Sequence, residues 1–187
     1  MKKLKLLFCL FSLILFLSCN KESSPTGPSS GPTVAMKATF EGGANGDFQG
    51  WRYLDTSGYH YVHFSHDVPS DGGSWSLQLQ LDTMKQHHIY YKAIPPDNVL
   101  PKILSFSFDI KTVGSLALMM QGYVWSDSGV ISFGGFYSEW TQWSRSTDLE
   151  TLNGSRIDSI TLDVSVGYGK AGDYALIDNV KIELYSQ

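Results

Sequence analysis

Strict alternation of apolar and polar residues is the feature that most limits the fold of this 187-residue chain. It is clearest in three segments, Trp75–Leu81, Leu104–Ile110 and Ile160–Val166. Successive side chains of a β-strand point to opposite faces, so each segment predicts a strand with one apolar face and one polar face. Such strands bury their apolar faces when two sheets pack together. The sequence therefore predicts an all-β, two-sheet antiparallel β-sandwich.

Short strands separated by turn residues fill the rest of the chain from Val34 onward. The predicted strands are Val34–Phe40, Tyr59–Phe64, Trp75–Leu81, His87–Ile94, Ile103–Lys111, Leu116–Trp125, Val130–Phe136, Thr141–Thr147, Ile157–Val166 and Tyr174–Leu184. No segment has a sustained period of 3.6 residues. Helix is expected only as a turn or two, near Pro95–Asn98 or Asp148–Asn153.

The first 33 residues predict export and a tether. Met1–Lys5 is basic, and the apolar run Leu6–Leu17 is about half as long as a membrane-spanning helix, so residues 1–18 are interpreted as a signal peptide. Residues 19–33 are rich in Pro, Gly and Ser and have nothing to bury, which is typical of an extended tether. The sandwich is expected to occupy residues 34–187.

The segment Phe16-Leu-Ser-Cys19 resembles the lipobox of bacterial lipoproteins. The resemblance implies that Cys19 carries the lipid and is the only link to the membrane. It also implies a bacterial cell-envelope location, as an outer-membrane lipoprotein exposed at the surface. The alternative is an ordinary signal peptide with an incidental cysteine.

Charge and cysteine content exclude two other kinds of protein. Residues 19–187 carry 11 basic and 18 acidic side chains, a net charge of −7, and nucleic-acid binding relies on clustered Lys and Arg. The chain has two cysteines, Cys9 and Cys19, so no disulfide can hold the sandwich together. We expect no nucleic-acid partner, and a monomer stabilised by its core.

The closing segment Asp173–Leu184 contains a feature that needs an explanation. Asp178 and Asn179 interrupt an otherwise apolar strand, and burying such groups without partners is costly. The apolar residues on the two sides of this pair share one face only if the strand bends near Asp178–Asn179. The sequence therefore predicts an irregular strand and a partner for the carboxylate.

Several segments, in the same order along the chain, resemble the jelly-roll carbohydrate-binding modules that bind cellulose, xylan and related glycans. They are Thr39–Gly42 with Gly50-Trp51, Gly73–Leu79, Ile103–Lys111, Gln142-Trp143 and Leu176–Ile182. The resemblance implies a galactose-binding-domain-like jelly roll and a polysaccharide or oligosaccharide ligand. It also implies a structural calcium ion held by Glu41 and Asp178, with carbonyl oxygens from the Asp71–Ser74 turn. Without calcium, Asp178 would be hydrogen-bonded and Glu41 exposed.

Aromatic and amide side chains on polar strand faces are the candidates for glycan binding. The segment Leu116–Trp125 has an apolar face formed by Leu116, Leu118, Met120 and Val124, which turns Gln121, Tyr123 and Trp125 outward. Further candidates are Tyr90 with His88 and Lys92, and Tyr137 with Trp140. Exposed aromatic side chains at this density indicate a binding surface.

Two other functions stay open at this stage. The segment Tyr168–Tyr174 resembles part of the jelly-roll alginate lyases, where a tyrosine acts as acid and base, although the accompanying Arg-x-Glu motif of those enzymes is not matched. A structural or adhesive sandwich without a glycan ligand is the other alternative. Neither a Gly-x-Ser-x-Gly elbow nor a cysteine nucleophile occurs in the sandwich. The sequence favours non-catalytic glycan binding.

Overall fold

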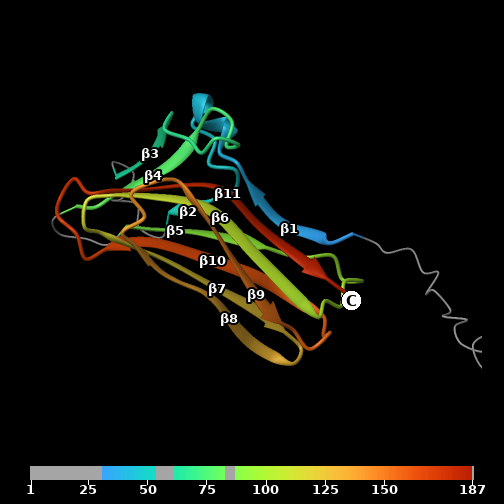
Figure 1. The fold of residues 1–187 in the computed structure, drawn as a ribbon. Helices are drawn as coiled ribbons and strands as arrows, with labels where there is room; N and C mark the ends of the chain where they lie inside the picture. The colour runs from blue at the N-terminus through green and yellow to red at the C-terminus, as the bar shows by residue number, and fades with distance from the viewer. Residues whose placement is uncertain (1–30, 54–60, 83–86, 187) are drawn as a thin grey trace, which may run out of the picture. The chain divides into compact units, whose positions relative to one another are not determined.

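The computed structural model describes residues 31–53, 61–82 and 87–186, which form two antiparallel β-sheets packed face to face (Figure 1). Sheet A contains β1 (Thr33–Ala38), β3 (Val62–Ser65), β4 (Ser76–Gln80), β6 (Ile103–Val113), β9 (Ser144–Thr151) and β11 (Tyr174–Tyr185). Sheet B contains β2 (Arg52–Tyr53), β5 (His87–Ala93), β7 (Ala117–Ser126), β8 (Gly129–Ser138) and β10 (Ile157–Gly167). The predicted two-sheet sandwich is confirmed.

The core lies between the sheets and uses the alternation seen in the sequence. In β6, the apolar residues Leu104, Phe106, Phe108 and Ile110 are all fully buried. In β10, the residues Ile160, Leu162, Val164 and Val166 are buried opposite them. The rings of Phe106 and Phe133, from the two sheets, meet at 5.2 Å between centroids. Each sheet consequently keeps one outer face for polar side chains.

Three details differ from the sequence-based prediction. The two-residue strand β2 was not predicted, because two residues show no period. The helical element with defined bounds is a 3-10 helix at Glu41–Asn45 (η1), which is not at either of the two places expected. The strand β9 begins three residues later than predicted and continues through Asp148, which excludes a helix there.

Strand order in sheet A explains the irregular closing strand. β6 pairs with one edge of β11, whereas β4 pairs with the other edge at Tyr174–Ile177 and β1 pairs with it at Val180–Leu184. The β6 register shifts between Asp178 and Lys181, and Asn179 has a φ of 48°. A β-bulge therefore lies where β11 changes partners, and the predicted bend is confirmed.

The N-terminal segments lie outside the described residues, including the predicted signal peptide and Cys19. Within the part of the chain that the structure describes, no helix has the length and apolar character needed to cross a membrane.

Candidate functional site

The outer face of sheet B, here called the sheet B face, brings five outward residues into one row across all five strands. The row follows from the strand registers and reads Arg52, Tyr90, Asp163, Gln121 and Gly134. Residues directly opposite each other in neighbouring antiparallel strands lie about 5 Å apart. The row is therefore a continuous polar strip perpendicular to the strands, about 19 Å from the first strand to the last.

Neighbouring rows add aromatic rings to this strip. Tyr123 lies between Thr161 and Ser132, and Trp125 lies between Ser159 and Val130. The two rings are 6.3 Å apart between centroids, and Trp125 is 45% exposed. The division of β7 into a buried apolar face and an outward polar and aromatic face is confirmed. Of the predicted ligand residues, the structure brings together Tyr90, Gln121, Tyr123 and Trp125.

A surface hollow lies at each end of the row. At the β8 edge, a hollow of about 480 Å³ is lined by Met119, Met120, Gln121, Ser132, Phe133, Gly134, Gly135, Phe136 and Glu150. At the β2 edge, a hollow of about 320 Å³ is lined by Gly50, Arg52, Tyr90, Tyr91, Lys92 and Ile94. Gly134 has a φ of 92°, and a Cβ there would lie 2.2 Å from the Met120 carbonyl oxygen. Because this position has no side chain, the row is open at the β8 edge.

Tyr137 does not point outward, so that expectation is wrong. β8 continues to Ser138, which places Tyr137 on the inward face with Phe133. Its hydroxyl donates a hydrogen bond to Asp148 Oδ2 on β9 at 3.0 Å. Its ring packs against that of Phe108, with 4.9 Å between the ring centroids. Burial, followed by the bond to Asp148, raises the pKa of Tyr137 to about 12. Tyr137 joins the edges of the two sheets.

Trp140 is half-buried and does not share the row of Tyr90 and Gln121. Its ring meets that of Tyr137 edge to face at 5.9 Å. It also lines a separate hollow of about 380 Å³ with Glu139, Thr141, Gln142, Ser144 and Arg145. The predicted set of ligand residues is thus divided between two places.

The carboxylates of Glu41 and Asp178 meet the same glycine turn. The backbone N–H groups of Ser74 and Trp75 donate to Glu41 Oε1 at 2.9 and 3.2 Å. A Cβ on Gly73 would lie 2.4 Å from Glu41 Oε1, and a Cβ on Gly72 would lie 2.3 Å from Asp178 Oδ2. Both glycines are therefore needed for the carboxylates to approach the turn so closely.

Asp178 is fully buried, and its charge is only partly compensated. The Asn179 N–H donates to its Oδ1 at 2.6 Å, but Oδ2 has no hydrogen-bond partner in the described structure. Burial first, and then the nearby carboxylates of Asp109, Glu41 and Asp71, raise the pKa of Asp178 to about 7. No group of three or more His, Cys, Asp or Glu residues converges here or elsewhere in the described residues, so a cation at Asp178 would also need backbone carbonyl oxygens.

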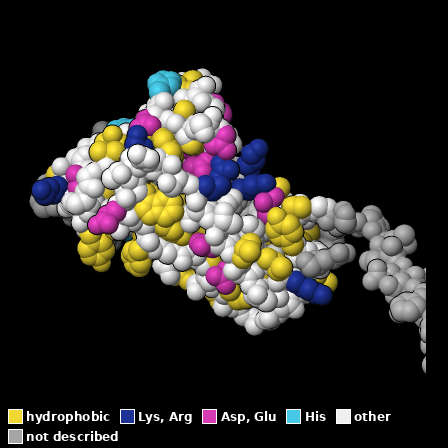
Figure 2. All heavy atoms as spheres, viewed as in Figure 1, with side chains coloured by type: hydrophobic (Ala, Val, Ile, Leu, Met, Phe, Trp, Pro, Cys, Tyr) yellow, Lys and Arg dark blue, Asp and Glu magenta, His cyan; other side chains and the backbone are white. Residues whose placement is uncertain are grey.

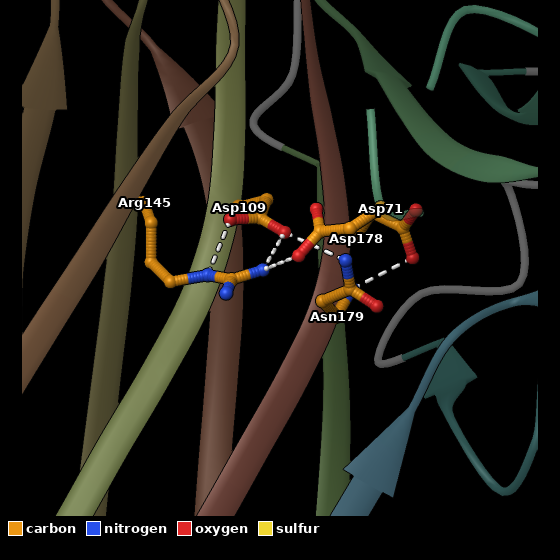
Figure 3. Close-up of polar contacts among 5 residues, drawn as sticks. All are labelled: Asp71, Asp109, Arg145, Asp178 and Asn179. Carbon is orange, nitrogen blue, oxygen red and sulfur yellow. Dashed lines mark hydrogen bonds and ion pairs between the residues drawn. The ribbon is translucent and has the colours of Figure 1, made fainter. Parts of the chain in front are cut away.

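Asp109, next to Asp178, is buried with its charge fully paired (Figure 3). Arg145 on β9 donates from Nε and Nη2 to the two oxygens of Asp109, at 2.8 and 2.7 Å. The same Nη2 reaches Asp71 Oδ2 at 2.9 Å, and Asn179 Nδ2 donates to Asp109 Oδ2 at 2.7 Å. This network fixes β9, the Asp71 turn and the β11 bulge relative to one another.

The outer face of sheet A is largely self-paired. Figure 2 shows basic and acidic side chains side by side over β1 and β11. Lys181 Nζ lies 2.7 Å from Glu183 Oε1, and Lys111 Nζ lies 2.6 Å from Asp67 Oδ2. The Trp143 indole N–H donates to the same Asp67 carboxylate at 2.8 Å. These polar groups bond to one another within the protein, so they are not free to bind a ligand.

The Tyr168–Tyr174 segment forms the turn between β10 and β11. The N–H groups of Lys170 and Ser115 donate to Asp173 Oδ2 at 2.9 and 3.0 Å, which closes the turn. Tyr168 is 82% exposed, with a φ of 61°. The segment is therefore a closed turn that leads into the last strand.

Arg52, Asp163 and Gly134 belong to the row but were not selected from the sequence. The alternation of β10 already turned Asp163 outward, but the register that places it between Tyr90 and Gln121 is a long-range property. Arg52 lies on the short strand β2, which carries no sequence signal. The row could therefore be identified only from the pairing registers of the strands in sheet B.

No protein-family model matches this chain, and no curated protein matches it. Solved structures do match. The family 61 module TmCBM61, solved with β-1,4-galactotriose, is 18% identical with a TM-score of 0.52, over 79% of this chain and 98% of that one. The CBM22-1 xylan-binding domain of Paenibacillus barcinonensis Xyn10C is 16% identical with a TM-score of 0.52, over 83% and 97%.

The C-terminal family 22 carbohydrate-binding module of Clostridium thermocellum Xyn10B is 15% identical with a TM-score of 0.54, over 81% and 93% of the two chains. The resemblance to carbohydrate-binding modules noted in the sequence is confirmed at the level of the fold.

The raised pKa of Asp178 predicts a pH-dependent stability in chelator-containing buffer. The ordinary carboxyl pKa is 3.8, so between about pH 4 and about pH 7 the native state holds a proton that the unfolded chain has lost. The free energy of unfolding should therefore fall as the pH rises through this range. Asp178→Asn should remove this contribution, as measured by urea unfolding at several pH values, and the exposed-face variant Asp163→Asn should keep it. Identical pH profiles for wild type and Asp178→Asn would contradict the prediction.

Proposed function

We propose that this protein binds a polysaccharide or oligosaccharide on the sheet B face without transforming it. The row from Arg52 to Gly134, with a hollow at each end, is the observation that carries the proposal. A linear polar strip open at its edge suits an extended polymer that crosses the strands. The similarity in fold to carbohydrate-binding modules supports the same conclusion.

The side chains of this face suit a sugar chain. Tyr123 and Trp125 offer rings on which the C–H face of a sugar can stack, and aromatic side chains supply much of the energy at recognition sites. Gln121 and Asp163 lie side by side in the row and can bond neighbouring hydroxyl groups. His88 Nδ1 lies 3.3 Å from Asp163 Oδ1 and helps to orient that carboxylate. Stacking supplies affinity, and the polar groups supply selectivity.

Removing either ring should weaken binding while leaving the fold intact. We expect Trp125→Ala and Tyr123→Ala each to raise the Kd for the glycan about tenfold or more, equivalent to about 1.4 kcal/mol, because a stacked ring is lost. A glycan array would first identify the ligand, and affinity electrophoresis would then compare the variants. Tyr168→Ala is the matched control, since that ring is exposed in the β10–β11 turn.

The result also separates the alternatives. If both variants bind as wild type does and Trp140→Ala does not, the ligand occupies the hollow at Trp140. If the folded wild type binds no glycan on the array, the proposal fails and a structural or adhesive role takes its place. Gln121→Ala is an independent test of binding to the sheet B face, because removing this exposed side chain leaves the core unchanged.

We also propose that Glu41 and Asp178 hold a structural calcium ion with carbonyl oxygens of the Asp71–Ser74 turn. Calcium takes carboxylate and carbonyl oxygens as ligands. Three observations support the fit: the unpartnered Asp178 Oδ2, the two glycines that let both carboxylates reach one turn, and the surplus of carboxylates nearby. A bound cation would offset the cost of the buried charge on Asp178 and join η1, the turn and β11.

Calcium should therefore raise the melting temperature. At a free concentration one hundred times the Kd, binding to the native state adds about 2.7 kcal/mol, which corresponds to roughly 5–10 °C for a domain of this size. We expect Glu41→Gln and Asp178→Ala to lose the response, and Asp163→Asn to keep it, in thermal melts with calcium or with chelator. A wild-type melting curve that ignores both additions would show that the carboxylates serve only as hydrogen-bond acceptors.

The N-terminal sequence supports a lipid anchor at Cys19 in the outer membrane of a bacterial cell, with the sandwich displayed at the surface. The short apolar run before Ser18-Cys19 directs export, and acyl chains at the cysteine would provide the attachment, each buried methylene contributing about 0.8 kcal/mol. A tether of about 14 residues would hold the binding face away from the lipid.

Replacing Cys19 by Ser should release the protein from the membrane into the soluble fraction. The acyl chains cannot be attached to serine, and the remaining apolar run is too short to span a bilayer. Fractionation of cells that express each form, followed by immunoblotting, measures this, with Cys9→Ser as the matched control. Membrane association of the Cys19→Ser protein equal to that of wild type would rule out the anchor.

A further inference from the structure

Two cations border the same tyrosine at the β2 edge of the sheet B face. Arg52 on β2 lies directly opposite Tyr90 on β5, and Lys92 lies two residues further along β5 on the same side. Arg52 and Lys92 are both exposed. Together with Tyr90 they line the 320 Å³ hollow, and we call these three residues the cationic corner.

The pairing of the three arginines of this chain sets Arg52 apart. Arg145 contacts Asp71 and Asp109, and Arg156 contacts Asp97, Asp127 and Asp158. No ion pair to Arg52 or Lys92 occurs among residues 31–53, 61–82 and 87–186, although acidic side chains outnumber basic ones in residues 19–187. The charges of the corner are therefore available to a ligand.

The shape of the corner suits a planar anion beside a ring. Gly50, with a φ of 88°, contributes no side chain to the hollow. The Tyr91 ring also lines the hollow, and it lies about 3.0 Å from where a Cβ on Gly50 would be. A guanidinium group binds a carboxylate through two parallel N–H donors, and Lys supplies a second charge without a fixed geometry. Tyr90 gives the sugar ring a surface beside the anion. A carboxylated sugar uses all three side chains at once.

Two residues of the cationic corner, Arg52 and Tyr90, are also the first two residues of the row. Tyr90 is followed across the sheet by Asp163 and Gln121, which suit hydroxyl groups, and Asp163 is already engaged with His88. A chain lying on the row would place neutral hydroxyls over the centre of the sheet and one sugar over the corner.

We propose that the glycan bound by the sheet B face is acidic, and that Arg52 and Lys92 bind the carboxylate of a uronic acid residue stacked against Tyr90. This inference rests on the glycan-binding function proposed above and specifies its substrate class. The corner distinguishes a uronate-bearing polymer from its neutral counterpart by charge and by a bidentate contact.

The test compares acidic and neutral glycans in matched pairs with the purified full-length chain. The pairs are glucuronoxylan with unsubstituted xylan, polygalacturonate with galactan, and polymannuronate with mannan, together with one sulfated galactan. Affinity electrophoresis and calorimetry would be run on wild type, Arg52→Gln, Lys92→Gln and the double variant. Lys102→Gln is the control, because it removes an exposed positive charge that lies outside the sheet B face and has no ion pair within the described part of the chain.

For at least one pair we expect the acidic member to bind at least tenfold more tightly, with a preference that shrinks as salt is added. Arg52→Gln and Lys92→Gln should each reduce that preference severalfold without changing the melting temperature, because the affinity for the acidic member should fall more than the affinity for the neutral member. Lys102→Gln should change nothing.

The outcomes separate this inference from the proposed function. Equal affinity for the members of every pair, unchanged in the double variant, would overturn the inference and leave glycan binding intact. Binding of the sulfated galactan but of no uronate would overturn the carboxylate assignment. Absence of binding to the whole panel and to a glycan array by the folded wild type would overturn the proposed function, and the inference with it.

Discussion

The exchange of partners along β11 is the constraint on which sheet A depends. One edge of this strand accommodates β4 and then β1, and the change falls at Asp178. The backbone at that point cannot follow a regular ladder on both edges, so it forms a bulge, with Asn179 in the left-handed region that asparagine tolerates. The Gly72-Gly73 turn comes close to the chain at this point, where it meets the buried carboxylate of Asp178.

Much of this arrangement could be predicted from local sequence, because burial alternates with a period of two. The inward faces of β6, β7 and β10 and the bend at Asp178–Asn179 follow from that period. The resemblance to known modules also named Glu41 and Asp178 together. Registers between strands are set by contacts between distant segments, however, so the row from Arg52 to Gly134 could not be read from the chain. The orientation of Tyr137 was predicted wrongly because β8 continues two residues beyond its predicted end at Phe136. Within the longer strand, Tyr137 lies on the inward face with Phe133.

The two outer faces differ in how their polar groups are used. On sheet A, Asp109, Arg145, Asn179 and Asp71 bond to one another, and their removal would leave buried charges unpaired. On sheet B, the outward side chains rest on strands whose inward residues already form the core, so they contribute little to folding. Such side chains are available to bind a ligand. The division explains why the sandwich can keep a rigid fold while one face presents aromatic rings, amides and cations to the solvent.

An acidic chain can still select an acidic polymer, because the two effects operate over different distances. A net charge of −7 over residues 19–187 produces a diffuse repulsion, and salt at physiological strength screens it beyond about 8 Å. Contacts at the cationic corner act at hydrogen-bonding distance, where screening is weak and the geometry of the guanidinium decides the energy. Part of the acidic charge that lies elsewhere is also compensated locally, since Arg156 contacts the carboxylates of Asp97, Asp127 and Asp158. Selectivity of the sheet B face is therefore governed by which charges its own side chains leave unpaired, and only weakly by the charge of the whole molecule.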